Sequence, residues 1–267
     1  MINKGVFIIS RSFLIVFFSI LYGINESYSQ LLVGARVGGG VSWVKHETDL
    51  NKDEFTSKPV LAYNVGLATA IKVRNRFFLQ TDILYARKGK YIEGVDDPNL
   101  ENKASYHYLS VPIIYRVDFK GAISDLDFKW YVGAGPIINY WMSGKGTLKS
   151  SELDENDIDV LDYGLEFNYD PDLPEDMLYI VEPNRFQFGL LFSAGTVFEP
   201  LPNNYIVVEA RLELGHSYLA DGQGEFPDVL GYVDDLRVRS KSLQLSVSYL
   251  FDTQISKRKK GKSNYKK

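Results

Sequence analysis

Charged side chains interrupt segments of this chain that otherwise alternate between apolar and small residues. They are Arg36, Asp82, Arg116, Glu209, Arg211 and Glu213. Charges of both signs that face one narrow interior could line a selective pore or relay protons. They could equally pair and fill that interior, which satisfies buried charge. We favour the paired network, because the interior of a small barrel leaves little room for water.

An acidic segment, residues 144–184, could bind divalent cations. Its carboxylates are Glu152, Asp154, Glu155, Asp157, Asp159, Asp162, Glu166, Asp170, Asp172, Glu175, Asp176 and Glu182. The run Asp154-x-Asn156-x-Ile158 breaks the alternating oxygen ligands of an EF-hand loop and lacks the glycine that follows them. Interspersed apolar residues argue against simple disorder. We expect a solvated, partner-binding loop, part of which extends the strands or folds as a hairpin, with diffuse cation binding as the alternative.

The C-terminus is basic, with Lys257, Arg258, Lys259, Lys260, Lys262, Lys266 and Lys267. Basic residues beside an anionic membrane each contribute about 1 kcal/mol to binding. Inner-leaflet headgroups, an acidic periplasmic protein and peptidoglycan are candidate partners, and a solvated tail is the alternative. A periplasmic position makes nucleic acid an unsuitable partner.

Enzymatic signals are weak. The histidines His46, His107 and His216 are isolated, and the hydroxyl of Ser217 is one residue out of step with a His-x-Ser pair. Neither metal-ligand spacing nor a phosphate-binding glycine loop can be read. We therefore predict no catalytic residue, cofactor or metal, although a catalytic triad is spatial and order-free.

The elements that must position these residues are strands, because side chains alternate with period 2 in eight segments. Long connections (45–59, 89–105, 144–184, 220–238) alternate with short ones (72–76, 119–126, 199–204). In an up-and-down sheet this places all long loops on one rim. The polar face is rich in Gly, Ala and Ser, which suits a barrel lumen better than the wet face of a lipocalin-like barrel or a sandwich. We predict an all-β, eight-stranded antiparallel up-and-down transmembrane β-barrel.

Several further features fit a membrane barrel. Aromatic residues lie near both predicted rims, as interfacial girdles do. Charged residues that the alternation places on the lipid-facing side occur only near the long-loop rim, where they can reach headgroups. They are Arg87, Arg239 and Lys241. Cysteine is absent, which excludes disulfides and a lipoprotein anchor.

Three regions follow from this pattern. Residues 1–29 are predicted to be a signal peptide, since the positive charges of Lys4 and Arg11 precede an apolar core, residues 13–22, too short for the roughly 20 residues of a membrane span. Residues 30–252 form the barrel, and residues 253–267 form the basic periplasmic tail. Both termini would then be periplasmic and the long loops extracellular.

Four strand segments carry short signatures: Gly34-Ala35-Arg36-Val37-Gly38-Gly39, Leu84-Tyr85-Ala86-Arg87-Lys88-Gly89, Tyr108-Leu109-Ser110-Val111-Pro112 and Tyr131-Val132-Gly133-Ala134-Gly135-Pro136. These signatures resemble the PorT-like outer-membrane β-barrel family of Bacteroidetes. The chain end, with Gln244, Ser246, Tyr249 and Phe251, resembles the C-terminal signal read by the barrel-assembly machinery, with Ser246 where glycine is usual. Pro183-Asn184-Arg185 departs from the Asp-x-Gly of many relatives.

The resemblance implies an outer-membrane location rather than a reaction. We expect a non-enzymatic structural or interaction protein that acts through its external loops or basic tail. Outer-membrane lipids, lipopolysaccharide and a periplasmic or outer-membrane protein are its expected partners. The alternatives are an accessory component of a type IX secretion or gliding apparatus, and a lipid-facing outer-membrane enzyme.

Overall fold

The computed structural model describes residues 30–46, 55–95, 99–123, 126–155, 158–167, 177–226 and 233–253. Eight long strands run through this part of the chain. They are β1 (Leu31–His46), β3 (Val60–Arg74), β4 (Phe77–Gly94), β5 (Glu101–Ile123), β6 (Leu126–Lys149), β9 (Phe186–Leu201), β10 (Asn204–Tyr218) and β13 (Val238–Asp252). All eight predicted strand segments are therefore present.

These strands pair antiparallel into a closed ring. β1 lies between β3 and β13, and the pairing of β6 with β9 completes the circuit. The prediction of an eight-stranded antiparallel barrel is confirmed. Backbones approach closely in the wall: a Cβ at Gly34 would lie 1.8 Å from the carbonyl oxygen of Tyr249, so only glycine fits there.

The alternation of side chains separates two environments. Apolar residues face outward, and many are more than half exposed, such as Leu61, Leu67, Ile83 and Phe188. The charged residues of the middle of the strands face inward and are buried. An apolar outer band around a polar interior is the pattern of a transmembrane barrel. None of the described helices is long and apolar enough to cross a membrane.

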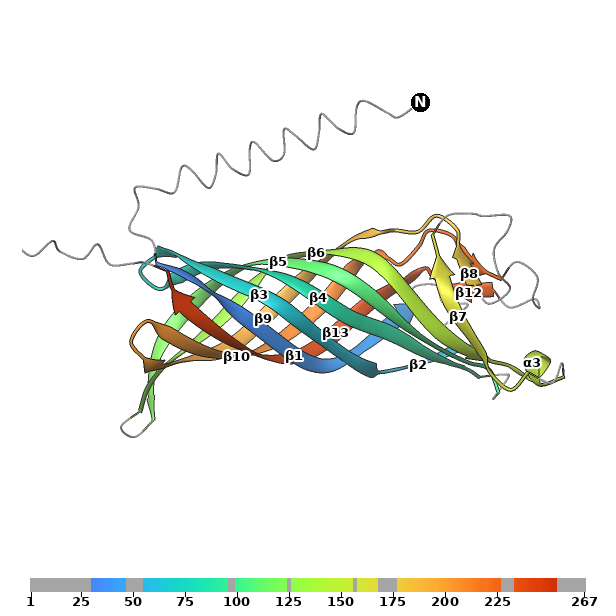
Figure 1. The fold of residues 1–267 in the computed structure, drawn as a ribbon, viewed down its shortest axis with the longest axis horizontal. Helices are drawn as coiled ribbons and strands as arrows, with labels where there is room; N and C mark the ends of the chain where they lie inside the picture. The colour runs from blue at the N-terminus through green and yellow to red at the C-terminus, as the bar shows by residue number, and fades with distance from the viewer. Residues whose placement is uncertain are drawn as a thin grey trace, which may run out of the picture.

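The short turns gather at one end, on the left of Figure 1. Asn75 and Asn203 adopt positive φ values of 42° and 67° in the β3–β4 and β9–β10 turns. Asparagine tolerates this conformation better than most residues, which explains its use in two tight hairpins. The third hairpin differs from expectation: β5 and β6 continue to Ile123 and Leu126, so strand pairing extends through most of the predicted 119–126 connection.

The described parts of the long connections are largely folded, at the opposite end of the barrel (Figure 1). β4 and β5 continue through most of the predicted loop 89–105, and β6 continues through residues 144–149 of the predicted loop 144–184. Further short elements complete this end. They are β2 (Phe55–Lys58), α3 (Ser151–Glu155), β7 (Leu161–Glu166), β8 (Met177–Ile180), β11 (Gln223–Glu225) and β12 (Val233–Asp235). We call these six elements, with residues 158–160, 167, 181–183 and 219–238 as far as they are described, the cap.

Sheet pairing holds the cap to the barrel wall. β7 pairs antiparallel with the upper end of β6, β8 pairs parallel with β7, and β11 and β12 follow in order. β2 pairs separately with β4. The expectation that part of the acidic segment extends the strands is confirmed at β6 and β7, whereas β7 and β8 form a parallel pair rather than a hairpin.

Candidate functional site

Four of the six predicted lumen charges form one compact cluster. Arg36 Nη1 lies 2.5 Å from Glu209 Oε2, and its Nε lies 3.4 Å from Asp82 Oδ2. Arg211 contacts the same two carboxylates, at 2.5 Å from Asp82 and 3.1 Å from Glu209. All four side chains are almost completely buried. Two arginines and two carboxylates thus neutralise one another where an isolated charge would be very costly.

Arg116 does not join this cluster directly. It lies between two aromatic rings, with its guanidinium carbon 4.7 Å from the ring centre of Phe78 and 4.5 Å from that of Tyr131. It donates to Gln80 at 3.1 Å and pairs with Asp118 at 3.1 Å. Gln80 in turn donates to Glu209, so a neutral amide links Arg116 to the cluster.

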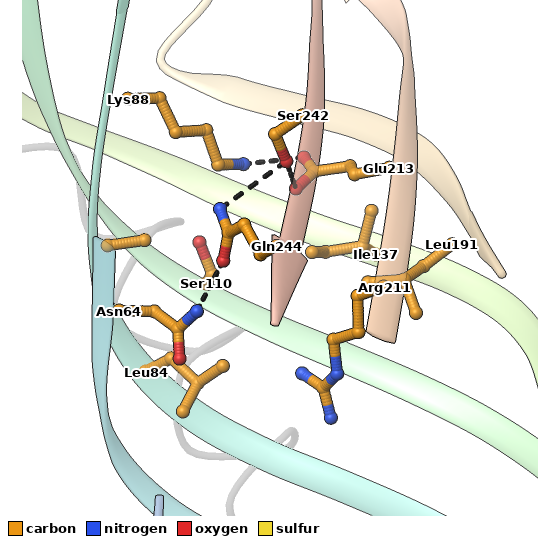
Figure 2. A pocket seen from close by; sticks show the side chains of 11 residues that line it. Asn64, Leu84, Lys88, Ser110, Ile137, Leu191, Arg211, Glu213, Ser242 and Gln244 are labelled. Atoms are coloured by element: carbon orange, nitrogen blue, oxygen red, sulfur yellow. Dashed lines mark hydrogen bonds and ion pairs between the residues drawn. The ribbon is translucent and has the colours of Figure 1, made fainter. Parts of the chain in front are cut away.

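Glu213 belongs to a second polar layer nearer the cap. Its carboxylate lies 2.5 Å from Lys88 Nζ and accepts a hydrogen bond of 2.8 Å from Asn139. Ser242 donates to its other oxygen. Figure 2 shows Lys88, Ser242 and Glu213 converging, with Gln244 and Asn64 hydrogen-bonded beside them. The small cavity here has a volume of about 20 Å³, which is room for about one water molecule.

Apolar clusters close the interior at both ends. Toward the short turns, Leu32, Phe78, Tyr131, Val207 and Leu250 are among the buried residues of one cluster. Toward the cap, a larger cluster runs from the barrel wall into the cap elements. Between these clusters the lumen is filled largely by side chains, and a pocket of about 250 Å³ lies beside Val197 and Tyr205 at the short-turn end.

The cap has a core of its own, centred on Trp141. Its indole contacts Tyr106 and Phe167 edge-on, at ring-centre distances of 5.0 and 4.9 Å. Leu153 of α3 and Leu178 of β8 pack into the same cluster and are fully buried. Inward-facing side chains are thus mostly polar in the middle of the barrel and mostly apolar at the cap. There they form a core of the kind found in water-soluble proteins.

Two polar contacts lie inside this core. Lys90 of β4 forms a buried ion pair with Asp234 of β12. The hydroxyl of Tyr163 in β7 donates to Asn102 of β5 at 2.6 Å. Burial, followed by the nearby carboxylate of Asp234, raises the pKa of Tyr163 well above its ordinary value. These contacts fix the cap strands against the barrel strands.

The outward face of the cap is acidic. Glu166, Tyr179, Glu225 and Val233 occupy one row across its four strands. Four further carboxylates of the cap are exposed, namely Asp159, Asp162, Glu182 and Asp221. Asp154 of α3 is also exposed. The remaining carboxylates predicted in the acidic segment lie outside the described side chains, as do the basic tail residues and the signal peptide.

The predicted assembly-signal residues lie on both faces of β13. Gln244 and Ser246 face the lumen, where Ser246 accepts a hydrogen bond of 3.1 Å from Arg36. Tyr249 and Phe251 face outward, are 39% and 50% exposed, and contact each other edge-on at 4.9 Å. The end of β13 therefore presents a pair of aromatic rings to lipid.

The three histidines are far from forming one site. His46 stacks on Phe55 in the cap and lies 3.6 Å from Asp235, whereas His107 contacts the hydroxyl of Tyr85 on the outer wall. His216 is exposed, and the Ser217 hydroxyl accepts a hydrogen bond from the Phe188 amide. Among the described residues, no three metal-ligating side chains gather closely enough to hold an ion.

Sequence reasoning missed Lys88, Lys90 and their partner Asp234. All three fall in or beside segments predicted as loops, and the alternation of side chains between two faces was used only for segments predicted as strands. The even-numbered spacing of Asp82, Lys88 and Lys90 along β4 was the signal that could have found the two lysines.

Comparison with known proteins gives a consistent result. Residues 25–218 match the sequence family described as "Outer membrane protein beta-barrel domain". No curated protein sequence matches the chain. Similar solved structures include Neisserial surface protein A (14% identity, TM-score 0.36, covering 83% of this chain and 98% of that one). OprG from Pseudomonas aeruginosa has 9% identity and a TM-score of 0.46, covering 84% and 94%. The attachment invasion locus protein Ail of Yersinia pestis, in complex with a heparin analogue, has 16% identity and a TM-score of 0.34, covering 83% and 99%.

Proposed function

Because the chain belongs to the outer membrane protein beta-barrel domain family, we propose that it is a non-enzymatic outer-membrane protein that binds another envelope component through its cap. The folded cap core is the observation that carries this proposal. Flexible loops lose conformational entropy when they bind, whereas a surface built on a packed core is already ordered. Leu153, Leu178 and Trp141 hold the cap strands in one arrangement before any partner arrives.

The acidic outward face favours a basic partner. Glu166 and Glu225 flank Tyr179 in the central row, and Tyr179 offers an aromatic side chain of the kind enriched in interfaces. Long-range attraction between opposite charges would speed the encounter. The proposed occupant is therefore a protein with a basic, partly apolar surface.

Crosslinking in native envelopes tests this proposal. A photo-crosslinking amino acid at Tyr179 of the full chain should capture a protein identified by mass spectrometry, and one at lipid-facing Tyr115 should not. The charge-reversal variant Glu166→Lys/Glu225→Lys should lose the crosslink, whereas Lys120→Glu/Lys129→Glu at the short-turn rim should keep it. Capture that survives charge reversal on the cap would contradict the proposal.

We also propose the orientation, with the cap outside the cell and both chain ends in the periplasm. β1 begins and β13 ends at the short-turn rim, where Thr253 N donates to Leu31 O. The chain has no cysteine, so single cysteines report accessibility directly. An impermeant maleimide should label Asp221→Cys in intact cells, and Lys120→Cys only after the outer membrane is opened. The reverse pattern would refute this orientation.

A second candidate role belongs to the basic tail. We propose it as a docking segment for a periplasmic assembly, as expected if the chain is PorT-like and serves a type IX secretion or gliding apparatus. The position of the end of β13 at the short-turn rim supports this, because the tail starts there. Deleting residues 256–267 should remove periplasmic partners from the purified complex, and unchanged copurification would exclude the docking role.

The barrel-assembly machinery is the proposed partner during insertion. The exposed pair Tyr249 and Phe251 at the end of β13 is the expected contact. Phe251→Ala should slow appearance of the heat-modifiable folded form in pulse-labelled cells, whereas Phe198→Ala on β9 should not. Equal folding rates in the two variants would remove this assignment.

A further inference from the structure

Cations gather on the outer wall, between the lipid-facing band and the cap. Arg87, Lys103 and Lys145 belong to β4, β5 and β6 and face outward. Strand register places them in three successive rows. The rows are Tyr63–Arg87–His107–Ser143, Gly89–Ser105–Lys145 and Tyr91–Lys103–Thr147. We call Arg87, Lys103 and Lys145 the basic patch.

Aromatic and hydroxyl groups order two members of the basic patch, Arg87 and Lys103. The guanidinium of Arg87 lies 6.0 Å from the ring centre of Tyr63 and donates to Ser105 Oγ at 2.6 Å. Lys103 Nζ lies 5.6 Å from the ring centre of Tyr91. A cation over an aromatic face keeps its charge and its outward donors while losing conformational freedom. These side chains are thus preordered for an anion.

Carboxylates of the neighbouring row are already paired. Glu93 lies 2.5 Å from Lys58, and Glu101 lies 4.0 Å from Lys149. Within the part of the chain that the structure describes, no carboxylate contacts Arg87, Lys103 or Lys145. The contrast with the lumen is direct, because its arginines all have acidic partners. On the neighbouring strand β7, Asp162 lies opposite Thr147 at the cap side of the basic patch and forms no ion pair with its cations. The basic patch therefore keeps an excess of positive charge.

Its position identifies the ligand class. Directly below the basic patch, Val65 and Leu109 are 48% and 40% exposed and face lipid. Their row also contains Tyr85 and Tyr140, which mark the edge of the apolar band. An anion that belongs to a lipid can place its acyl chains on this band and its charge on the basic patch, whereas a soluble anion gains only the second contact.

We propose that the basic patch binds the phosphorylated headgroup of an outer-leaflet glycolipid, the lipid A of lipopolysaccharide. This rests on the proposed orientation of the barrel. Arg87 presents the planar donor fork that suits phosphate oxygens, and Lys103 and Lys145 add charge on the side facing the cap. The ligand would bridge β4, β5 and β6 just outside the girdle formed by Tyr63 and Tyr85.

Native mass spectrometry of the detergent-solubilised full chain tests the proposal. The probes are diphosphoryl lipid A, the same lipid with both phosphates removed, and inorganic phosphate. The variant Arg87→Ala/Lys103→Ala/Lys145→Ala should bind diphosphoryl lipid A about 100-fold more weakly, since each basic residue near an anionic surface contributes about fivefold. A charge-matched control, Arg74→Ala/Lys120→Ala/Lys129→Ala at the other rim, should bind like the natural protein. The heat-modifiable gel shift verifies folding of each variant, and Lys103→Ala/Lys145→Ala provides a milder second variant.

Three outcomes would overturn the proposal. One is equal binding of dephosphorylated lipid, which would show that acyl chains alone suffice. Another is an equal loss in the control variant, which would show that total charge decides. The third is tight binding of inorganic phosphate alone, which would make the site one for a soluble anion. The cysteine labelling pattern reports the orientation separately, and the Tyr179 crosslink reports cap function, so failure of either is distinguishable from failure of the basic patch.

Discussion

At the scale of single residues, the charged side chains inside this barrel pair with one another instead of lining an open channel. Arg36 and Arg211 each contact both Asp82 and Glu209, so every charge in the cluster has two partners. Removing one member of such a buried group leaves the others uncompensated, which is more damaging than replacing the whole group.

The variant Glu209→Gln tests this arrangement. It keeps the side-chain volume but leaves Arg36 and Arg211 with one carboxylate between them. We expect the free energy of unfolding to fall by about 3–5 kcal/mol, as for other broken buried ion pairs. Urea unfolding of the barrel in lipid vesicles measures it. Glu199→Gln, at an exposed position, is the control and should change the value by less than about 0.5 kcal/mol. Equal stabilities would show that the cluster contributes little.

Tyr91, on the outer face where β2 joins β4, gives a pH-dependent prediction. A hydrogen bond to Glu93, followed by burial and nearby carboxylates, raises its pKa to about 12. Since the folded state prefers the neutral phenol, this contribution to stability is complete below pH 10 and is lost as the pH rises from 10 through about 12. The ultraviolet difference titration between the natural protein and Tyr91→Phe should show this late ionisation, and Glu93→Gln should move it toward 10. A midpoint near 10 in the natural protein would contradict the contact.

At the scale of elements, strand extension is the main departure from a plain barrel. β4, β5 and β6 continue beyond the aromatic girdle, and most of their inward side chains there are apolar, with the buried Lys90–Asp234 pair among them. The short cap strands add to the edge of β6 and cover this apolar surface. The same sheet therefore contacts lipid in the barrel and water at the cap.

Leu153 of α3 tests whether the cap is a separate cooperative unit. It is fully buried in the cap core, so Leu153→Ala should destabilise the cap by about 2–5 kcal/mol. Because the barrel is held by its own strand ladders, its heat-modifiable gel shift should persist. Limited proteolysis should cleave the cap of the variant much faster than that of Ile158→Ala, an exposed control. Loss of the whole barrel would show instead that cap and barrel fold as one unit.

The sequence predicted the barrel because its signal is periodic and local. Alternation along β1 or β13 depends only on which side chains face lipid, so Val37 or Leu245 could be placed without knowing their neighbours. The cap could not be predicted this way, since β8, β11 and β12 are three or four residues long and pair with distant segments. The lumen charges were predicted by face, but the separation of Arg116 and Glu213 from the central cluster depends on their heights in the wall. Those heights follow from strand register, which a single sequence does not determine.

At the scale of the whole molecule, the interior contains two polar layers and apolar clusters at both ends. The cavity beside the Lys88–Glu213 pair, about 20 Å³, has no room for a water column. The molecule therefore presents an outer wall and two rims to its surroundings rather than a passage between them. The surfaces that the described residues offer to other molecules are therefore the outer wall and the two rims.

Planar bilayer recordings test the sealed interior. Purified protein should give no steady conductance, because moving an ion past the Arg36–Glu209 and Lys88–Glu213 pairs requires breaking them. The same preparation should show the heat-modifiable gel shift of the folded protein, so that an absence of conductance reflects a closed barrel and not an unfolded one. Reproducible channels of nanosiemens size would refute the sealed lumen.

The continuous path of hydrogen bonds from membrane to cap has a mechanical consequence. β6, with 24 residues, pairs with β5 and β9 in the barrel and with β7 in the cap. A pull on the cap along the barrel axis would load these ladders lengthwise, so that many bonds resist together instead of opening one at a time. A force applied to the cap would thus be transmitted to the membrane-embedded barrel through strand ladders loaded in shear.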